Sequence, residues 1–587
     1  IPIIKSKGYG DFPAEEIVKK LNITELDDPK LEEATKEIYK AGFHTGTMTD
    51  ICGKFSGKRV EEAKELMKAE MLEKNQADLF YDLSEEVICR CGGKVIIKRI
   101  DDQWFIRYSD PELTERSKEQ VKEMKIYPQE YHHNLPAILD WFSDRACARL
   151  GNWLGSKLPF DERWIVEPIS DSTLYPAYYI VSKWIENKTI KVKDLTEEFF
   201  DYVFLNIGEG KPKWKPIKEE FDYFYPLDIN LGGKEHKTVH FPVFLMNHVA
   251  ILPEDKWPKG IFVNWWVTGK GSKISKSKGG AVPIPEAVEK YGVDAMRLYY
   301  AHIGSPHLDV IWTEDIVMNY KNSLERVILL ISELKKVDGK KKSVDDWLVS
   351  RMNEHLKKIA HEMEDYNLRE LASTVYFTIY DDLKWYIRRG GENKKVIEET
   401  INTWLKLMNP ITPHMSEELN DTKELVSSSE WPEIDQNKIS LKANAGEQLV
   451  RTAIDGMRNV LKLAKLEKAN KYTLFVAEEW LYELFNLVSS EIKITRNIGE
   501  IMKKVLEIER MKMKGKEISK IVLGLVKDVS KIPALVTSQI EEYDIIIEAK
   551  DFLEKEFNCK INVVKGEDSK ENKAKSAMPG KVGILVE

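Results

Sequence analysis

The chain has 587 residues, of which 42% are apolar and 32% charged, and its formal net charge is −8. This length exceeds what one hydrophobic core supports, so we expect about two to four domains in a globular protein of ordinary composition. The negative net charge gives no sign of nucleic-acid binding, so a polyanion would have to be bound by local basic patches. No apolar run reaches the roughly 18 residues of a membrane helix, because Asn247 and His248 interrupt the run 243–252.

The N-terminal residues and the cysteines indicate in which cellular compartment the protein is expected. No basic region followed by an apolar stretch opens the chain, so no secretory signal is visible, and the start Ile1-Pro2 without methionine suggests a fragment or a subunit. Five cysteines form no disulfide framework and indicate a reducing compartment, so we predict a cytoplasmic protein with no membrane partner. Cys89 and Cys91 could be half of a zinc site, but tetrahedral zinc takes four ligands and no second pair follows, so we favour reduced cysteines and predict no metal site.

The first two regions differ in their predicted secondary structure. Residues 1–85 predict helices at 13–21, 31–40 and 60–72 and contain no catalytic cluster. From about 86 to 315, short strand-like runs alternate with loops rich in Trp, Pro and Gly, which is typical of an α/β domain with a surface site. The predicted strands are 95–97, 104–106 and 261–267.

Residues 316–445 predict a helical bundle. Apolar residues recur there at steps of three or four, so each helix carries one apolar stripe that must pack against its neighbours. The three series are Leu348, Met352, Leu356, Ile359 and Met363; Leu371, Val375, Ile379, Leu383 and Ile387; and Ile397, Ile401, Leu405 and Met408. Prolines at 410 and 413 end the third helix, and the polar stretch 421–444 predicts a linker or an irregular cover.

Residues 446–587 predict a smaller α/β domain, with strands at 472–476, 543–548, 560–564 and 582–586 between amphipathic helices. Between 502 and 531 the chain has nine Lys and Arg against four acidic residues. Such a run suits a polyanion, although a solvated helix face explains it equally well.

The segment Lys273-Ile274-Ser275-Lys276-Ser277 lies between glycines and carries the strongest chemical signal. A nucleotidyl transfer expels pyrophosphate, and the charge that grows on this leaving group needs cations placed in advance on a loop that glycine lets close. A lysine-rich surface loop is the alternative. With a predicted strand before it and a helix-like stretch at 293–299 after it, the segment resembles the second signature of class I aminoacyl-tRNA synthetases, usually K-M-S-K-S.

Residues 164–175, W-I-V-E-P-I-S-D-S-T-L-Y, followed by A-Y-Y at 177–179, resemble a segment of the leucine-specific enzymes of that class in their archaeal and eukaryotic-cytosolic form. In that family the segment lines the aminoacyl-adenylate pocket. The resemblance implies that Asp171 binds the α-ammonium group of leucine or a neighbouring polar group, while Tyr175 and Tyr178 form the wall around the leucine side chain. Taken by itself, the triplet that begins at Asp171 would also fit a helix N-cap.

The stretch from Gly232 to His236, G-G-K-E-H, with His240 four residues on, is similar to the family's adenosine-binding segment. Glycine allows close approach to a ribose, and a carboxylate can accept both of its hydroxyl protons. We therefore predict that ATP is bound by Gly233 and Glu235 at the ribose, by His240 at the base or phosphate side, and by Lys276. A solvent-exposed turn is the alternative.

Class I enzymes also need an H-I-G-H signature, which these residues lack. The look-alike His302-Ile303-Gly304 follows the lysine loop, whereas the true motif precedes it by hundreds of residues, so we predict a structural role for His302. The beginning of the chain resembles the trailing part of the family's inserted editing domain. The chain thus resembles the C-terminal part of a class I leucine enzyme, without the half that contains H-I-G-H.

This resemblance implies a multidomain fold, α/β plus all-α, in four parts. They are the end of the editing domain (1–85), the second half of a Rossmann-like class I catalytic domain (86–315), an anticodon-binding-type helical bundle (316–445) and a small C-terminal α/β tRNA-binding domain (446–587).

The implied reaction converts ATP, L-leucine and tRNA(Leu) to AMP, pyrophosphate and leucyl-tRNA(Leu). ATP would arrive with Mg²⁺, and a partner half or subunit would supply the missing H-I-G-H and editing core. The predicted catalytic residues are Lys273, Ser275, Lys276 and Ser277, and the predicted tRNA-phosphate contacts are Lys503, Lys504, Lys512, Lys514, Lys575 and Lys581. Two alternatives stay open: another class I enzyme, for isoleucine, valine or methionine, and a non-catalytic tRNA-binding paralogue.

Overall fold

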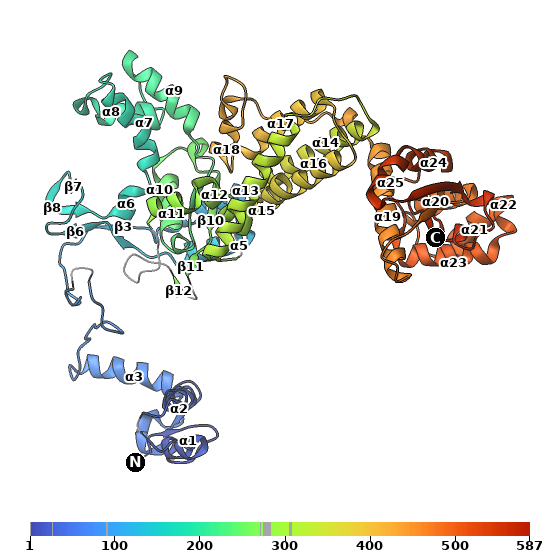
Figure 1. Cartoon of the computed structure of the whole chain (residues 1–587). Coiled ribbons are helices and arrows are strands. Elements are labelled where there is room, and N and C mark those ends of the chain that lie inside the picture. Colours follow the sequence, from blue (N-terminus) through green and yellow to red (C-terminus); the bar gives the residue numbers. More distant parts are fainter. Residues whose placement is uncertain (1, 26, 90–91, 270–271, 274–282, 305–307) are drawn as a thin grey trace. The chain divides into compact units, whose positions relative to one another are not determined.

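The computed structural model describes residues 2–25, 27–89, 92–269, 272–273, 283–304 and 308–587 and divides into two compact units after Trp104 (Figure 1). The first unit contains β1 (Ile4–Lys5), α1 (Pro13–Leu21), α2 (Lys30–Tyr39), β2 (Thr47–Met48) and α3 (Val60–Glu73). The three predicted helices are confirmed, and a small core forms where Ile17 of α1 and Ala34 of α2 are buried together. The strand predicted at 95–97 is wrong, since that stretch forms no strand and leaves Ile96 74% exposed.

The second unit begins with an α/β region. Its elements are β3 (Phe105–Ile106), α4 (Pro111–Glu123), β4 (Lys125–Tyr127), α5 (Gln129–Asp140), β5 (Arg145–Ala146), β6 (Ala148–Leu150), β7 (Lys157–Leu158), β8 (Asp161–Val166), α6 (Pro168–Ser172), α7 (Tyr175–Glu186), α8 (Glu197–Phe204), α9 (Lys215–Phe224), β9 (Asn230–Gly233), α10 (His240–Ile251), β10 (Gly260–Asn264), β11 (Val267–Gly269), β12 (Ser272–Lys273), α11 (Ile284–Tyr291), α12 (Val293–Ile303) and β13 (Val310–Trp312).

A three-stranded parallel sheet, in the order β4-β10-β9, forms the centre of this region. Helix α10 is apolar on all sides, and its residues from Phe241 to Val249 are all buried, as expected of a helix inside the core. Even its last histidine is accommodated there: burial lowers the pKa of His248 to about 4, so the ring is neutral, and its Nδ1 lies 2.7 Å from the carbonyl oxygen of Phe244.

The strand predicted at 261–267 is in fact two strands in different sheets. β10 belongs to the parallel sheet, whereas β11 pairs in parallel with β13 and antiparallel with β12. The break falls at Trp265 and Trp266, where the backbone N–H of Trp266 donates to Asp309 Oδ1 at 3.1 Å. Such a break cannot be predicted from a continuous apolar run, because the hydrogen-bond partner, Asp309, lies more than forty residues away in the sequence.

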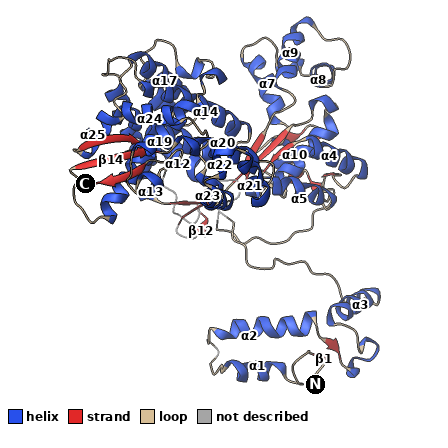
Figure 2. Cartoon of the chain, turned by 90° about the vertical axis from the view of Figure 1, so that its right-hand side faces the viewer, coloured by secondary structure: helices blue, strands red, loops and turns tan. Residues whose placement is uncertain are grey.

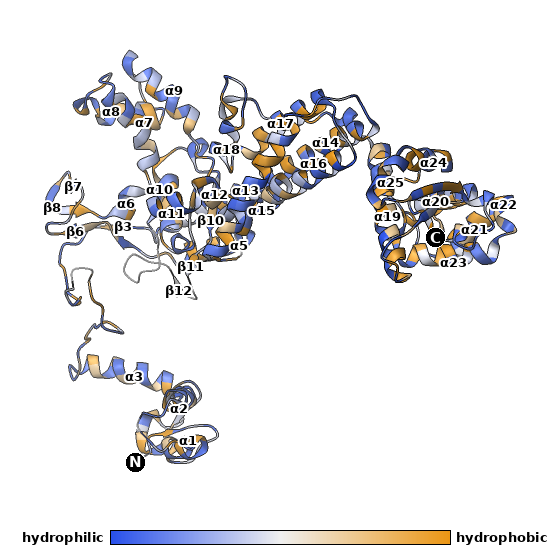
Figure 3. Cartoon of the chain, in the orientation of Figure 1, coloured by the Kyte–Doolittle hydropathy of each residue, from blue (hydrophilic) through white to orange (hydrophobic). Residues whose placement is uncertain are grey.

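The bundle comprises α13 (Glu314–Leu334), α14 (Ser343–Glu364), α15 (Leu368–Ser373), α16 (Ile379–Arg388), α17 (Lys394–Met408) and α18 (Pro413–Glu418). The predicted apolar stripes are largely buried in one continuous core, and hydrophobic, orange segments are visible among the bundle helices around α14 and α17 in Figure 3. Helix α12 joins this bundle: Arg297 donates to the carbonyl oxygens of Ile411 and Pro410, and Asp294 accepts the N–H of Met415 at 2.6 Å.

The last region contains α19 (Leu441–Leu463), β14 (Lys471–Val476), α20 (Glu479–Ile492), α21 (Ile498–Glu507), α22 (Glu509–Lys512), α23 (Gly515–Lys527), α24 (Gln539–Glu548), α25 (Lys550–Phe557), β15 (Lys560–Lys565) and β16 (Gly583–Val586). Strand β14 lies between β15, to which it is parallel, and β16, to which it is antiparallel (Figure 2), and α19, α24 and α25 pack against this small sheet. Three of the four predicted strands are confirmed.

The fourth, 543–548, is wrong, because it lies in α24. Ser538 and Glu541 form a reciprocal capping box at the start of this helix, and Ile546 is fully buried while Ile547 is 42% exposed. Three consecutive isoleucines favour a strand locally, but the cap and the one-sided burial stabilise the helix.

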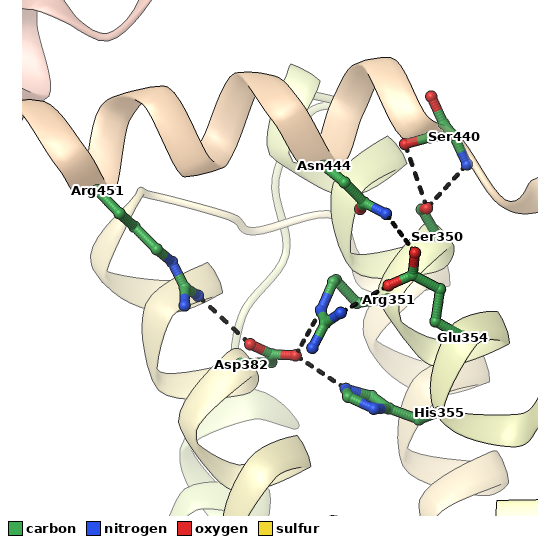
Figure 4. Close-up of polar contacts among 8 residues, drawn as sticks. All are labelled: Ser350, Arg351, Glu354, His355, Asp382, Ser440, Asn444 and Arg451. Atoms are coloured by element: carbon green, nitrogen blue, oxygen red, sulfur yellow. Dashed lines mark hydrogen bonds and ion pairs between the residues drawn. The ribbon is translucent and has the colours of Figure 1, made fainter. Parts of the chain in front are cut away.

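A charged network fastens α19 to the bundle (Figure 4). Asp382 on α16 accepts from Arg351 Nε at 3.0 Å and lies 2.9 Å from His355 Nε2, both on α14, and it also accepts from Arg451 of α19 at 3.3 Å. Asn444, also on α19, donates to Glu354 of α14 at 2.7 Å.

None of the helices in the described ranges is long and apolar enough to cross a bilayer.

Candidate functional site

The predicted ribose-binding turn lies at one edge of the parallel sheet. β9 and β10 are neighbours that run in the same direction, so their carboxyl ends, Gly233 and Asn264, lie at the same edge. Ligands of open α/β sheets bind outside that edge. The glycine turn with Glu235 follows β9 directly, and β10 leads through β11 to the lysine segment, so both predicted nucleotide-binding elements start from adjacent strand ends.

The turn after β9 is tightly built. The N–H of Gly233 donates to His236 Nδ1 at 3.0 Å, and a Cβ on Gly232 would lie 2.9 Å from both that nitrogen and the Phe241 ring. Only glycine therefore fits at 232 without displacing the ring. Lys234 Nζ donates to Asp309 Oδ1 at 2.5 Å, which ties the turn to the same carboxylate that holds the break between β10 and β11.

Glu235 and His240 flank this turn. The Glu235 side chain is partly exposed, and among the described residues it makes no hydrogen bond or ion pair, so its carboxylate is available to a ligand. His240 is half-buried at the first turn of α10, with its ring centroid 4.9 Å from that of His236. Burial, and secondarily the charge of His236, lowers the pKa of His240, so a neutral ring that can donate and accept is expected near pH 7.

The lysine segment is described only in part. Lys273 belongs to β12, where its backbone is opposite Thr268 of β11. Ser275, Lys276 and Ser277 lie outside the described residues, so their role stays a prediction.

The predicted amino-acid residues lie on α6 and α7. Asp171 is exposed on α6, and the helix cap there is Glu167, whose carboxylate accepts the N–H of Ile169 at 2.8 Å. Among the described residues the Asp171 carboxylate caps no helix, which removes the N-cap explanation for it. Tyr175 and Tyr178 are 44% and 52% exposed on α7.

Helix α10 connects the two groups of residues. Asn247 is 6% exposed; it donates to Thr173 Oγ1 at 2.8 Å and to the Ser170 carbonyl at 3.4 Å, and it accepts from the Tyr108 hydroxyl at 3.0 Å. Asn247 follows His240 by seven residues, which is two helical turns, so both project from one side of α10 about 10 Å apart along its axis. The nucleotide and amino-acid elements are thereby attached to one face of a single buried helix.

Sequence reasoning missed Tyr108, Thr173, Asp309 and Asn247 as parts of this arrangement. The one available signal was Asn247, a polar residue inside the apolar run 243–252, because a buried amide must find hydrogen-bond partners.

The six predicted phosphate-binding lysines fall into three groups: three form ion pairs, one is exposed on α21, and two line a groove. Lys504, Lys512 and Lys514 form ion pairs with Glu491, Glu509 and Glu478 at 2.6, 2.7 and 3.2 Å. Lys503 is exposed on α21. Lys575 and Lys581 instead line a groove of about 680 Å³ with Lys520 and Lys531, so two basic segments far apart in the sequence meet there.

Besides these four lysines, apolar and polar side chains line the groove. Its other lining residues include Phe485, Ile521, Leu525 and Met578, with Glu517 as its one acid, and α19 contributes Gln448 and Thr452. Cationic side chains gathered in a groove can neutralise the phosphates of a nucleic acid. Within the described ranges, no cluster of three or more His, Cys, Asp or Glu side chains could hold a metal ion; Cys91 lies outside them.

Comparison with known proteins gives two family models and a set of alignments over the whole chain. The model "tRNA synthetases class I (M)" matches residues 220–327, and the model "Anticodon-binding domain of tRNA ligase" matches residues 345–476. Proteins from Methanocaldococcus jannaschii and Pyrococcus furiosus, both named leucine–tRNA ligase, are 37% and 36% identical over 606 and 618 residues. Each alignment covers 100% of this chain and 63% of the relative, so the chain spans less than two thirds of the relatives' length.

Proposed function

Because the whole chain aligns with two leucine–tRNA ligases at 37% and 36% identity, we propose that it belongs to that family and is a C-terminal part of an ATP-dependent enzyme that joins L-leucine to tRNA(Leu). In the first step a leucine carboxylate oxygen attacks the α-phosphorus of ATP, and pyrophosphate leaves. In the second step a terminal ribose hydroxyl of the tRNA attacks the carbonyl carbon of leucyl-adenylate, and AMP leaves. The observation that carries this proposal is that the predicted ribose-binding turn follows β9 at the carboxyl edge of the parallel sheet, while α10 carries both His240 and Asn247, whose amide is bonded to the segment of Asp171.

The roles follow from the chemistry of each side chain. Glu235 would accept hydrogen bonds from the ribose hydroxyls, and Gly233 would let the backbone come close to the ribose. Neutral His240 would face the base or the phosphates. Lys273 and Lys276, with Ser275 and Ser277, would neutralise the departing pyrophosphate, which arrives as part of Mg²⁺-bound ATP.

The leucine subsite would use the other two elements. The exposed Asp171 carboxylate would bind the α-ammonium group, and the rings of Tyr175 and Tyr178 would pack against the isobutyl side chain. The four-part division at residues 85, 315 and 445 belongs to the same proposal.

Among the described residues, one edge of the parallel sheet is unpaired, which supports the proposal that another part of the enzyme completes the sheet. The outer side of β4 is covered, because Lys125 Nζ donates to the Glu364 carbonyl and the rings of Tyr127 and Tyr366 are 5.0 Å apart. In the described part of the chain no strand pairs with the outer side of β9, where Leu231 is 59% exposed. Parallel sheets are normally buried and larger than three strands, so we propose that the half carrying H-I-G-H adds its strands along β9.

The experiment is ATP–pyrophosphate exchange with leucine. The chain alone should exchange no label above background, whereas the chain co-expressed with the remaining part of the enzyme should show leucine-dependent exchange, because only then is the nucleotide cradle complete. Parallel assays with isoleucine, valine and methionine identify the amino acid. Exchange by the isolated chain at the rate of the reconstituted enzyme would contradict the proposal, as would preference for one of the other amino acids.

For the tRNA we propose the lysine groove as a phosphate-binding surface. Lys575→Ala combined with Lys581→Ala should weaken tRNA binding and reduce the slope of log K against log salt by about 1 for each phosphate that the groove no longer neutralises. Filter binding over a range of salt concentrations measures both. The control is Lys512→Ala, which removes a lysine already paired with Glu509 and should leave the slope unchanged; equal slopes for the wild type and both variants would exclude the groove.

A further inference from the structure

We propose that Asn247 is a positioning residue for the leucine subsite, which it acts on by fixing the Ser170–Thr173 segment that carries Asp171. This inference rests on the function proposed above and adds a residue to it. Asn247 itself is buried in α10 and would touch neither leucine nor ATP.

The hydrogen bonds of Asn247 define one orientation. The Ser170 carbonyl can only accept, so the amide nitrogen must face it, and the same nitrogen donates its second hydrogen to Thr173 Oγ1. The amide oxygen is then left for the hydroxyl of Tyr108, whose pKa burial raises to about 12, so that it stays a donor. Tyr108, α10 and α6 are thus held together by one side chain.

The geometry explains why Asp171 depends on this amide. The two groups that Asn247 holds, the Ser170 carbonyl and the Thr173 hydroxyl, bracket Asp171 in the sequence, and Thr173 is 1% exposed. The Asp171 side chain itself is exposed and, among the described residues, forms no hydrogen bond or ion pair, so its direction is set by the backbone on either side. The carboxylate that would bind a ligand ammonium group is therefore positioned only as precisely as this backbone segment.

The nucleotide elements do not share these bonds. The turn after β9 is held by Gly233 N–H on His236, by Lys234 on Asp309, and by the Tyr131 hydroxyl, which donates to the Lys237 carbonyl at 2.8 Å. Loss of Asn247 should therefore act on leucine and leave ATP binding nearly intact. A general loosening of α10 would act on both.

The variants are Asn247→Leu and Thr173→Val, each tested in the enzyme reconstituted with its remaining part. Asn247→Leu keeps the size of the side chain but leaves the Ser170 carbonyl and the Tyr108 hydroxyl unpaired, and Thr173→Val removes one partner. Both should raise the KM for leucine, by roughly tenfold or more for Asn247→Leu, with the KM for ATP changed less than about twofold. Thr173→Ser keeps the hydroxyl and should restore the wild-type KM.

The matched control is His248→Gln, the adjacent buried residue of α10, whose ring faces Phe244 and Tyr225 instead of α6. It should lower the melting temperature without changing the KM for leucine. Equal rises of both KM values in Asn247→Leu, or an unchanged leucine KM in both Asn247→Leu and Thr173→Val, would overturn the positioning role. A wild-type reconstituted enzyme without leucine-dependent exchange would instead refute the proposed function, and this inference with it.

Discussion

Replacing Lys276 by alanine in the reconstituted enzyme is expected to lower leucine-dependent ATP–pyrophosphate exchange by about 10²–10³-fold, the loss typical of removing one preorganised group that stabilises transition-state charge. The pyrophosphate acquires most of its extra charge as the bond to the α-phosphorus breaks. The lysine therefore acts mainly in the transition state, and kcat should fall while the KM values for ATP and leucine change little.

The control is Lys290→Ala, which removes the same charge from α11, where Lys290 forms an ion pair with Glu314 at 2.7 Å. It should exchange at the wild-type rate. Lys276→Arg should rescue only in part, because a planar guanidinium replaces a compact ammonium group. An unchanged rate in Lys276→Ala would favour the non-catalytic tRNA-binding alternative, in which the loop has no role in adenylation.

The sequence predicted the helices best, for a physical reason. In the bundle each helix is set by its own apolar period, so residues such as Leu348, Ile359 and Leu383 could be assigned to the core from their spacing alone, and all three are fully buried. Local signals failed where a distant partner decides the outcome. At the break between β10 and β11 the N–H of Trp266 bonds to the distant Asp309, and the isoleucines of α24 are helical because Ser538 caps the helix and only one of its sides is buried in the core.

For the candidate site, too, the sequence predicted the polar side chains but not how the fold brings them together. Motifs identified which side chains carry charge or polar groups, such as Glu235, His240 and Asp171, but not that one helix joins them. They also could not distinguish the paired lysines from those that line the groove, because ion pairing with Glu478 or Glu491 depends on how α20 packs against α21–α23. Charge counted along the sequence is thus a poor guide to charge available to a ligand.

The second large effect is expected at Asp382, in the network of Figure 4. Its side chain is only 6% exposed and faces Arg351, His355 and Arg451. Burial alone would raise the pKa of Asp382, but the hydrogen bond from His355 and the charge of Arg351 outweigh it, so the pKa is lowered and the carboxylate is ionised at neutral pH. The stability it contributes is therefore complete above the ordinary carboxyl pKa of about 4 and is lost as the pH falls below it.

Asp382→Ala should lower the free energy of unfolding of this region by about 3 kcal/mol, the lower end of the cost of breaking a buried ion pair, because Asp382 and His355 are buried whereas the Arg351 and Arg451 side chains are 28% and 35% exposed. Hydrogen exchange in α14, α16 and α19 measures this locally, which avoids assuming two-state unfolding of a multidomain chain. The neighbouring Asp381→Ala is the control: Asp381 is exposed, and its loss should change stability by no more than about 0.5 kcal/mol. Equal effects of the two substitutions would contradict the assignment.

The same variant separates two activities of the proposed enzyme. Helix α19 presents Arg451 and Asn444 to the bundle and Gln448 and Thr452 to the lysine groove, so loosening it should disturb the groove. None of the network residues belongs to the sheet edge or to α10. Asp382→Ala should therefore weaken tRNA binding while leucine-dependent pyrophosphate exchange, which does not require tRNA in the groove, continues at the wild-type rate. A parallel loss of both would mean that the network supports the whole catalytic unit instead of the attachment of α19.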